Sequence, residues 1–258
     1  MWKAPAFAIA AAASFTVAQA QAADLKVFVG GAMTETVSKI GAEFARSSGH
    51  KLEFVSDTTG ALLNKLKAGE RADVIVVTEA AIDGLQKDGA LTDGSRTPLV
   101  RALVGVAIKS DSAATPDLSS VDAFKRSLLA AKTVSYVDPK AGGTSGTYFE
   151  GLLARMGIAE QLKPKIVYRT QGAGVADAVA TGAAELGVTF IAELSPNKGV
   201  KIAGPLPNEI QLPTNYLAAI PKTSANQDAA RAFIQAMKAP PGEAVFRGAG
   251  LQPLPSAR

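Results

Sequence analysis

The sequence LKVFVGGAMTETVSKIGAEFARS, residues 25–47, joins a strand pattern to a helical pattern through a turn of small residues. Alternating apolar residues predict a strand over 25–29, and apolar residues at helical spacing predict a helix over 35–47. The turn between them reads Gly-Gly-Ala-Met-Thr, and its small side chains let another group approach the backbone closely. A strand that leads through such a turn into a helix is typical of α/β proteins.

Three further turns of this kind end an apolar run and open a helical pattern, at residues 57–60, 141–146 and 170–174. The first backbone N–H groups of a helix have no partner within the helix and carry a partial positive charge. Such a turn can therefore hold an anion without a charged side chain. A single turn of this type is commonly only a helix cap, but four together predict a protein that binds a small anion.

Strand and helix patterns alternate along the rest of the chain. In the first part we expect strands at 51–55 and 73–77 and helices at 61–68 and 80–87. A second part begins with the apolar run 99–108, followed by helices at 119–130, 147–156 and 174–181 and strands at 133–137, 166–168 and 186–190. The last part has a strand at 215–220 and helices at 227–237 and 243–247.

This order predicts two α/β lobes, with parallel strands and right-handed crossovers, joined by two strand crossings. We place residues 23–100 and 203–258 in the first lobe and residues 101–202 in the second. Ligands of open α/β sheets bind beyond the carboxyl ends of the strands. All four turns occupy that position, so we expect two from each lobe to face one another across a cleft.

The N-terminus has the pattern of a secretory signal peptide over residues 1–22. Lys3 supplies a short positive region, and the apolar stretch 4–17 is too short for a membrane span. Ala-Gln-Ala repeats offer cleavage after either Ala20 or Ala22. We therefore expect export to the periplasm, with no membrane insertion after the leader is removed.

Composition excludes several classes of function. The chain of 258 residues has no cysteine, so it forms neither disulfides nor thiolate metal sites. Its net charge of +4 comes from scattered residues and only 6% of its residues are aromatic, which disfavours a nucleic-acid surface. His50 is the only histidine, and neither a phosphate-binding P-loop nor a metal-ligand cluster is present. We expect no cofactor.

The sequence resembles the molybdate-type branch of bacterial periplasmic solute-binding proteins over most of its length. The resemblance is carried by VFVGGAMT at 27–34, KAGERADV at 67–74, the Asp-Pro pair at 138–139 and LGVTF at 186–190. It implies the two-lobed type II periplasmic-binding-protein fold, with the ligand in the cleft between the lobes. It also implies a monomer that closes on its ligand by hinge motion and delivers it to an ABC permease.

Carried over residue by residue, the family's oxyanion pocket is incomplete here. Ala32 stands in place of a serine at the first turn, Thr59 keeps a hydroxyl at the second, and Phe190 stands in place of a cleft tyrosine. The two backbone donors fall near Ser145 and Gly172. Each unpaired ligand oxygen costs roughly 1–3 kcal/mol. Two lost donors therefore lower the affinity for molybdate by about two to four orders of magnitude.

Two arginines are candidates for holding an organic acid instead. Arg101 stands in the second apolar run near the expected lobe crossing, and Arg169 ends a strand immediately before the fourth turn. A planar guanidinium makes two parallel hydrogen bonds to a carboxylate. We therefore expect an organic di- or tricarboxylate rather than molybdate, bound by both arginines and by the turn residues Gly31, Thr58, Thr59, Thr144 and Ser145.

An enzymatic alternative stays open, because a few relatives of this family resemble enzymes rather than carriers, notably the bacterial aconitate isomerase. Moving the double bond of aconitate requires carboxylate clamps and a group that transfers a proton. The candidates for proton transfer are Asp57, Glu79, Asp138 and Tyr148, although Asp57 and Asp138 also fit roles in helix capping and turns. A pocket rich in carboxylates favours the enzyme, whereas arginines and hydroxyls alone favour the carrier.

Overall fold

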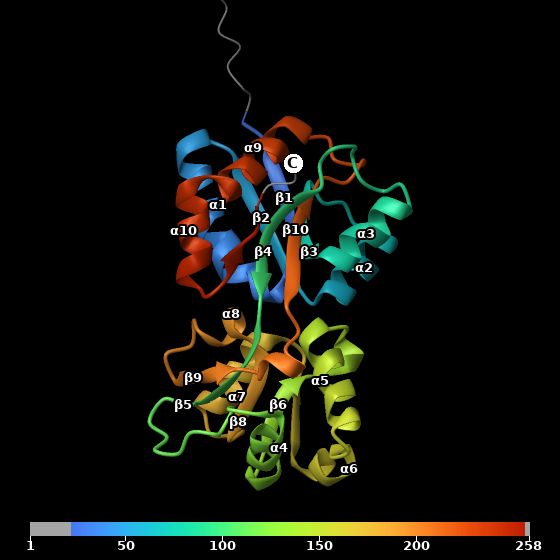
Figure 1. Ribbon diagram of the computed structural model, residues 1–258. Helices are drawn as coiled ribbons and strands as arrows, with labels where there is room; N and C mark the ends of the chain where they lie inside the picture. The colour runs from blue at the N-terminus through green and yellow to red at the C-terminus, as the bar shows by residue number, and fades with distance from the viewer. Residues whose placement is uncertain (1–21, 256–258) are drawn as a thin grey trace, which may run out of the picture.

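The computed structural model describes residues 22–255, which fold into two α/β lobes (Figure 1). The expected leader lies outside the described residues except for Ala22. No helix among residues 22–255 combines the length and apolarity needed to cross a bilayer.

The first lobe is built on a six-stranded sheet of order β11-β4-β10-β3-β1-β2, in which β1, β2 and β3 are parallel. Strand β10 runs antiparallel to β3 and β4, and β11 runs antiparallel to β4. The elements are β1 (Asp24–Gly30), the 3-10 helix η1 (Gly31–Met33), α1 (Thr34–Ser48), β2 (Lys51–Asp57), α2 (Thr59–Lys67), β3 (Val74–Thr78), α3 (Glu79–Lys87), β4 (Thr97–Ala102), β10 (Thr214–Ala219), α9 (Gln227–Lys238), α10 (Pro240–Gly248) and β11 (Gln252–Pro253).

The second lobe is built on a five-stranded sheet of order β7-β6-β8-β5-β9, in which β6 runs parallel to β7 and β8. Strand β5 is antiparallel to both β8 and β9. The elements are β5 (Val104–Lys109), α4 (Val121–Ala130), β6 (Val134–Val137), η2 (Pro139–Ala141), α5 (Thr144–Arg155), α6 (Ala159–Leu162), η3 (Lys163–Lys165), β7 (Ile166–Arg169), α7 (Gly172–Ala180), β8 (Leu186–Phe190), α8 (Ile191–Leu194), β9 (Val200–Pro205) and η4 (Asn208–Ile210).

The chain crosses between the lobes twice, at Leu103 and at residues 206–213 (Figure 1). The apolar run 99–108 is therefore two strands in two different sheets. The second crossing follows β9, which pairs with β5 in the second lobe, so it begins after residue 205 rather than at 202–203. The Gln211 side chain joins the two crossings, because it accepts from the Val104 N–H at 2.9 Å and donates to the Val104 carbonyl at 2.9 Å.

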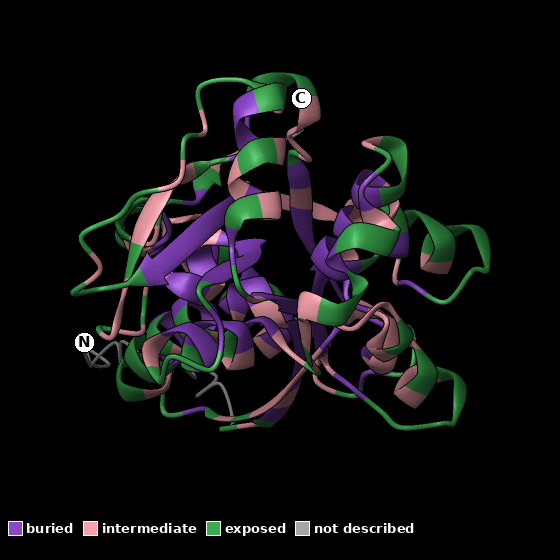
Figure 2. Cartoon of the chain, turned by 90° about the horizontal axis from the view of Figure 1, so that it is seen from below, coloured by how far each residue is buried: buried purple, intermediate pink, exposed green. Residues whose placement is uncertain are grey.

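The strands form the core of each lobe, and helices cover them (Figure 2). Every residue of β3 and of β8 is buried, which explains their continuous apolar runs. Strands β1, β2, β6 and β7 each end at one of the four small-residue turns, and each turn leads into a helix. The helices α5 and α7 begin two to three residues earlier than the periodicity predicted, because their first turns consist of the glycine and hydroxyl residues themselves.

Helix α5 lies so close to β6 that one of its glycines has no room for a side chain. A Cβ on Gly146 would lie 1.9 Å from the Val137 carbonyl oxygen, which is backbone and cannot turn away. Gly151 lies in the same helix, and a Cβ there would meet only the end of Arg155, at 3.4 Å.

We predict opposite effects of alanine at these two glycines. Gly146→Ala should lower the free energy of unfolding by about 3 kcal/mol or more, because overpacking against backbone is not relieved by a rotamer change. Gly151→Ala should leave the stability unchanged or raise it by up to about 1 kcal/mol, because alanine is the better helix former. Urea unfolding of the two variants checks this, and equal effects would contradict the close packing.

Candidate functional site

An inner pocket lies between the lobes, and residues from all four turns line it, as the sequence predicted. Its lining residues are Gly31, Thr58, Thr59, Val137, Gly143, Thr144, Ser145, Gln171, Gly172, Phe190, Glu193 and Tyr216. The cavity volume is about 20 Å³, which is room for a single water molecule. The lobes therefore stand close together around this point.

Two hydrogen bonds join the lobes directly beside the inner pocket. The Gly60 N–H donates to the Gly142 carbonyl at 3.2 Å, and the Thr58 hydroxyl donates to the Ala141 carbonyl at 2.5 Å. A Cβ on Gly60 would lie 3.0 Å from the Gly142 backbone, so glycine permits this approach. The same Thr58 hydroxyl accepts from the Ala61 N–H and thereby caps α2. The proton of the Thr58 hydroxyl is therefore used in the hydrogen bond between the lobes.

Helices α5 and α7 direct their N-termini at the inner pocket. The residues before them, Gly143 and Gln171, form no side-chain cap among the described residues. The first N–H groups of both helices therefore remain available to a ligand together with the partial positive charge of the helix end. The Ser145 hydroxyl adds a polar group 3.0 Å from the Thr189 hydroxyl.

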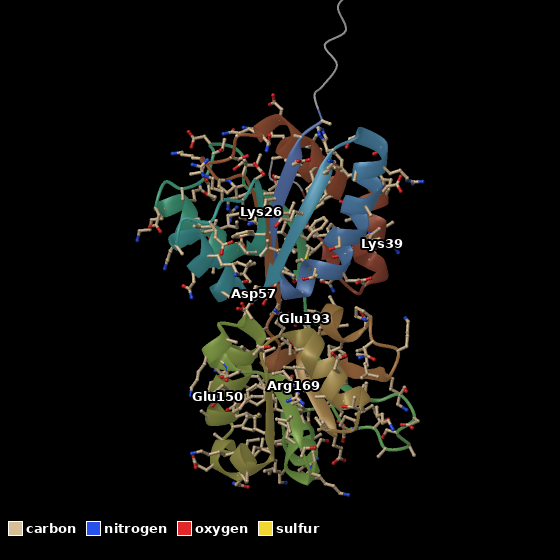
Figure 3. All side chains as sticks on the ribbon, turned by 180° about the vertical axis from the view of Figure 1, so that it is seen from behind. Lys26, Lys39, Asp57, Glu150, Arg169 and Glu193 are labelled. Atoms are coloured by element: carbon tan, nitrogen blue, oxygen red, sulfur yellow. The ribbon has the colours of Figure 1, made fainter. Side chains whose placement is uncertain are left out.

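Glu193 in α8 extends its carboxylate into the centre of this arrangement (Figure 3). Its Oε1 lies 2.4 Å from the position that a Cβ on Gly31 would take, and its Oε2 lies 2.1 Å from that of Gly172. The Thr189 hydroxyl donates to Oε2 at 2.6 Å. The Phe190 backbone supplies a further hydrogen bond. Phe190 precedes α8 and Glu193 is its third residue, so the carboxylate also caps its own helix.

Burial raises the pKa of Glu193 to about 7, and the hydrogen bonds from Thr189 and Phe190 only partly offset that effect. The Tyr216 ring in β10 packs edge-on against Phe190, with ring centroids 5.9 Å apart, and the residue is 3% exposed. Burial, followed by the nearby charge of Glu193, raises the pKa of Tyr216 well above its usual value. Glu193 and Tyr216 therefore both keep their protons to a higher pH in this pocket than they would if they were exposed to water.

An outer pocket of about 350 Å³ adjoins the inner one. The two share four lining residues: Gly31, Gln171, Gly172 and Glu193. The outer pocket is otherwise lined by Thr34, Glu35, Ser56, Ala173, Ala176, Asp177, Ala192, Pro196 and Asn197. Glu193 is the charged residue that lines both the small inner pocket and the larger outer one.

Most of the expected binding residues line the inner pocket, namely Gly31, Thr58, Thr59, Thr144, Ser145, Gly172 and Phe190. Ala32 does not line either of these pockets; it is buried in the core of the first lobe. Phe190 presents only its ring, which packs against Tyr216.

Neither of the two expected arginine clamps reaches the inner or the outer pocket of the described chain. Arg101 is exposed on β4, and its Nε donates to the Asn215 amide oxygen on the neighbouring β10 at 3.1 Å. The stem of Arg169 lies beside Gly174, where an added Cβ would meet it at 3.5 Å, and its Nη1 donates to the Tyr168 carbonyl at 2.8 Å. Both lie near strand ends as expected, but local partners draw their side chains away from the cleft.

The two aspartates proposed for proton transfer serve local turns instead. Asp57 accepts from the Thr58 N–H at 2.8 Å, and Asp138 accepts from the Lys140 N–H at 2.9 Å and caps η2. Neither lines the inner or the outer pocket. In addition, no group of three or more His, Cys, Asp or Glu side chains within residues 22–255 is placed to hold a metal ion.

Glu79 and Tyr148 also have partners outside the two cleft pockets. Glu79 accepts from Arg96 Nη2 at 2.7 Å and from Asn215 Nδ2 at 2.8 Å. The Tyr148 hydroxyl donates to the Ile210 carbonyl at 2.8 Å in the second crossing. The two contacts of Glu79 support the first lobe. The hydrogen bond of Tyr148 anchors the second crossing.

Sequence reasoning missed Glu193 as a pocket residue, and it did not single out Gln171 within the fourth turn or Tyr216 as binding residues. Glu193 belongs to α8, whose four residues are too few to show helical periodicity, so no pattern drew attention to it. A glutamate three residues after the end of a buried strand was the available signal, because it fits a helix cap. Tyr216 lies within a buried strand, which by itself does not distinguish core packing from pocket lining.

The chain is similar to known proteins over most of its length. The family described as bacterial extracellular solute-binding protein matches residues 25–252. An aconitate isomerase of Pseudomonas sp. is 30% identical over 238 residues, covering 90% of this chain and 88% of that protein. The molybdate-binding protein ModA of Azotobacter vinelandii is 29% identical over 255 residues, covering 95% and 96%. The solved structure of the A. vinelandii periplasmic molybdate-binding protein superposes with a TM-score of 0.72 at 24% identity, covering 90% of this chain and 99% of that one.

The raised pKa of Glu193 predicts a specific pH dependence of stability. The unfolded chain releases this proton near pH 4.5, whereas the folded protein keeps it to about pH 7. Wild-type stability should therefore fall as the pH rises through that window and stay lower above it. Glu193→Gln removes the titration, so the variant should match wild type at pH 4 and exceed it by about 3 kcal/mol at pH 8.

Denaturant unfolding at both pH values measures this difference. Glu160→Gln is the matched control, because the Glu160 side chain is 89% exposed in the same lobe and should give equal differences at the two pH values. A Glu193→Gln effect that is the same at pH 4 and pH 8 would contradict the buried position of the carboxylate.

Proposed function

Because the chain belongs to the bacterial extracellular solute-binding protein family, we propose that it binds a small organic carboxylate between its lobes and presents it to an ABC-type importer. The relatives that are periplasmic binding proteins support a periplasmic location. In this proposal one carboxylate oxygen of the ligand occupies the inner pocket, and the remainder of the ligand extends into the outer pocket.

The observation that carries this proposal is the convergence of two uncapped helix N-termini on one closed pocket. The starts of α5 and α7 supply N–H groups and partial positive charge, and Thr59, Thr144 and Ser145 supply hydroxyls. A carboxylate is a good acceptor for such donors. Closure of the lobes over it excludes water, which strengthens each hydrogen bond.

The outer pocket favours an organic ligand over a molybdate-like oxyanion. A tetrahedral oxyanion has no second part that could use the 350 Å³ beside the inner pocket. The hydroxyl and amide groups of Thr34, Ser56 and Asn197 line that space and suit hydroxyl groups on a carbon chain. The arginines that suggested a di- or tricarboxylate lie elsewhere, and Glu35 and Asp177 line the outer pocket. We therefore propose a ligand with one buried carboxylate and hydrogen-bond donors beyond it.

Aconitate isomerisation is the second candidate, and Glu193 is the observation that favours it. A group that removes and returns a proton works best when its pKa lies near the working pH, and that of Glu193 is about 7. The aconitate isomerase of Pseudomonas sp. is similar over 90% of the chain. The acidic lining of the outer pocket, Glu35 and Asp177, argues against it, because aconitate carries three carboxylates.

A thermal-shift series tests the ligand class. Molybdate, tungstate, sulfate, citrate, cis-aconitate, trans-aconitate and lactate are each titrated against the protein, because a ligand of the folded state raises the Tm with concentration. We expect lactate to raise it and molybdate to leave it unchanged. A shift with molybdate alone would overturn the carboxylate proposal.

Proton NMR of the sample with cis-aconitate then separates carrier from enzyme. An unchanged spectrum after prolonged incubation excludes the isomerase, and the appearance of trans-aconitate identifies it. In the second case Glu193→Gln should abolish turnover.

A pocket hydroxyl should matter for whichever carboxylate binds. Thr144→Val should weaken binding about tenfold, because it removes a hydrogen bond to a charged group worth about 1.5 kcal/mol. Thr181→Val at the far end of α7 is the control, since Thr181 is exposed and bonds only its own helix. Calorimetric titration of both variants measures the two affinities, and equal Kd values would place the ligand elsewhere.

A further inference from the structure

The carboxylate of Glu193 occupies the place where the geometry would otherwise put an oxygen of an anionic ligand. It lies against the first residue of α7, Gly172, and against Gly31 of the opposite lobe. A Cβ on Gly172 would stand 2.1 Å from the Glu193 carboxyl carbon. The protein thus already directs one carboxylate of its own at the helix end that suits an anion.

No positively charged side chain lines the pockets around Glu193 within the described residues. The titratable groups that line the pockets around it are Tyr216 from β10, Glu35 from α1 and Asp177 from α7. An ionised Glu193 beside an anionic ligand would therefore put two like charges into a nearly closed space.

We propose that Glu193 determines specificity by carrying a proton, so that the site binds an anion only when Glu193 is a carboxylic acid. The step is balanced by one proton from solvent: ionised Glu193, one proton and the free anion give a complex in which the Glu193 carboxyl group donates a hydrogen bond to the anion. No bond between heavy atoms forms or breaks. The inference rests on the proposed function in requiring that an anion binds in this cleft.

Glu193 is suited to this task near neutral pH. Burial raises its pKa to about 7 in the free protein, and a bound negative charge raises the pKa further. At pH 6 and below the acid is almost fully protonated and the affinity should be constant. At pH 8 and above almost every complex must take up a proton, so the apparent Kd should approach a tenfold rise per pH unit. A pocket of the same shape that is lined only by amide and hydroxyl groups would show no such dependence of Kd on pH.

Calorimetric titration from pH 6 to pH 9 tests the inference, with lactate, trans-aconitate and molybdate as probes. Measurements at pH 8 in two buffers of different ionisation enthalpy count the protons taken up. For wild type we expect about one proton per bound anion at pH 8 and a Kd about fivefold higher than at pH 7. Glu193→Gln keeps the shape and a donor, so its Kd should stay at the low-pH wild-type value with no proton uptake.

The outcomes separate this inference from the proposed function. If lactate or trans-aconitate binds to wild type with a Kd that is flat from pH 6 to pH 9, the carboxylate proposal stands and the role of Glu193 is overturned. If only molybdate binds and takes up a proton, Glu193 has the proposed role and the carboxylate proposal fails. If no probe binds to wild type or to Glu193→Gln, both are overturned.

A second pair of variants tests the position of Glu193 without any ligand. Gly172→Ala places a methyl group where the carboxylate lies and should push it toward solvent, whereas Gly174→Ala in the same helix meets nothing closer than 3.5 Å. The carboxyl ¹³C resonance of Glu193 should titrate near pH 7 in wild type and in Gly174→Ala. It should move toward the ordinary value of about 4.3 in Gly172→Ala. Equal midpoints in all three proteins would overturn the inference.

Discussion

Contact between the lobes depends on bare backbone, because Gly60 and Gly142 approach each other so closely that a Cβ on Gly60 would lie only 3.0 Å from the Gly142 backbone. A backbone hydrogen bond and the Thr58 hydroxyl bond hold the lobes together at this point. The pocket beside them owes its small volume to that approach. Glycines at the four turns therefore serve two purposes: they open the helix ends to a ligand, and they let the two lobes meet.

Closure also sets the electrostatics of the site. Glu193 in the second lobe lies against Gly31 in the first, so its carboxylate is buried by the meeting of the lobes rather than by its own helix alone. Burial of this kind raises the pKa of a carboxyl group. A carrier and an isomerase would both use this property. In a carrier the acid admits an anion, and in an enzyme it moves a proton on the bound molecule.

Local sequence patterns were enough to predict the order of the strands and helices. They did not fix a boundary that depends on pairing with distant strands. Strand β8 lies where its apolar run predicted, at 186–190. The run 99–108 was expected to hold the first lobe crossing between residues 100 and 101, but the two sheets divide it at Leu103. Nothing in the run itself marks the exact position of that division, because apolar buried residues lie on both sides of it. It depends on pairing with β10 in one lobe and β8 in the other.

By itself the sequence determined the two-lobed α/β architecture, the four turns and their convergence, because periodicity and turn chemistry depend on residues close together in the chain. Only the tertiary structure decided which side chains enter the pocket. Arg101 bonds Asn215 and Arg169 bonds its neighbour's carbonyl, while Glu193 enters from a helix too short to predict. The burial of a side chain can depend on residues far away in the chain, as with Glu193 and Gly31 of the opposite lobe, and that contact exists only once the lobes have met.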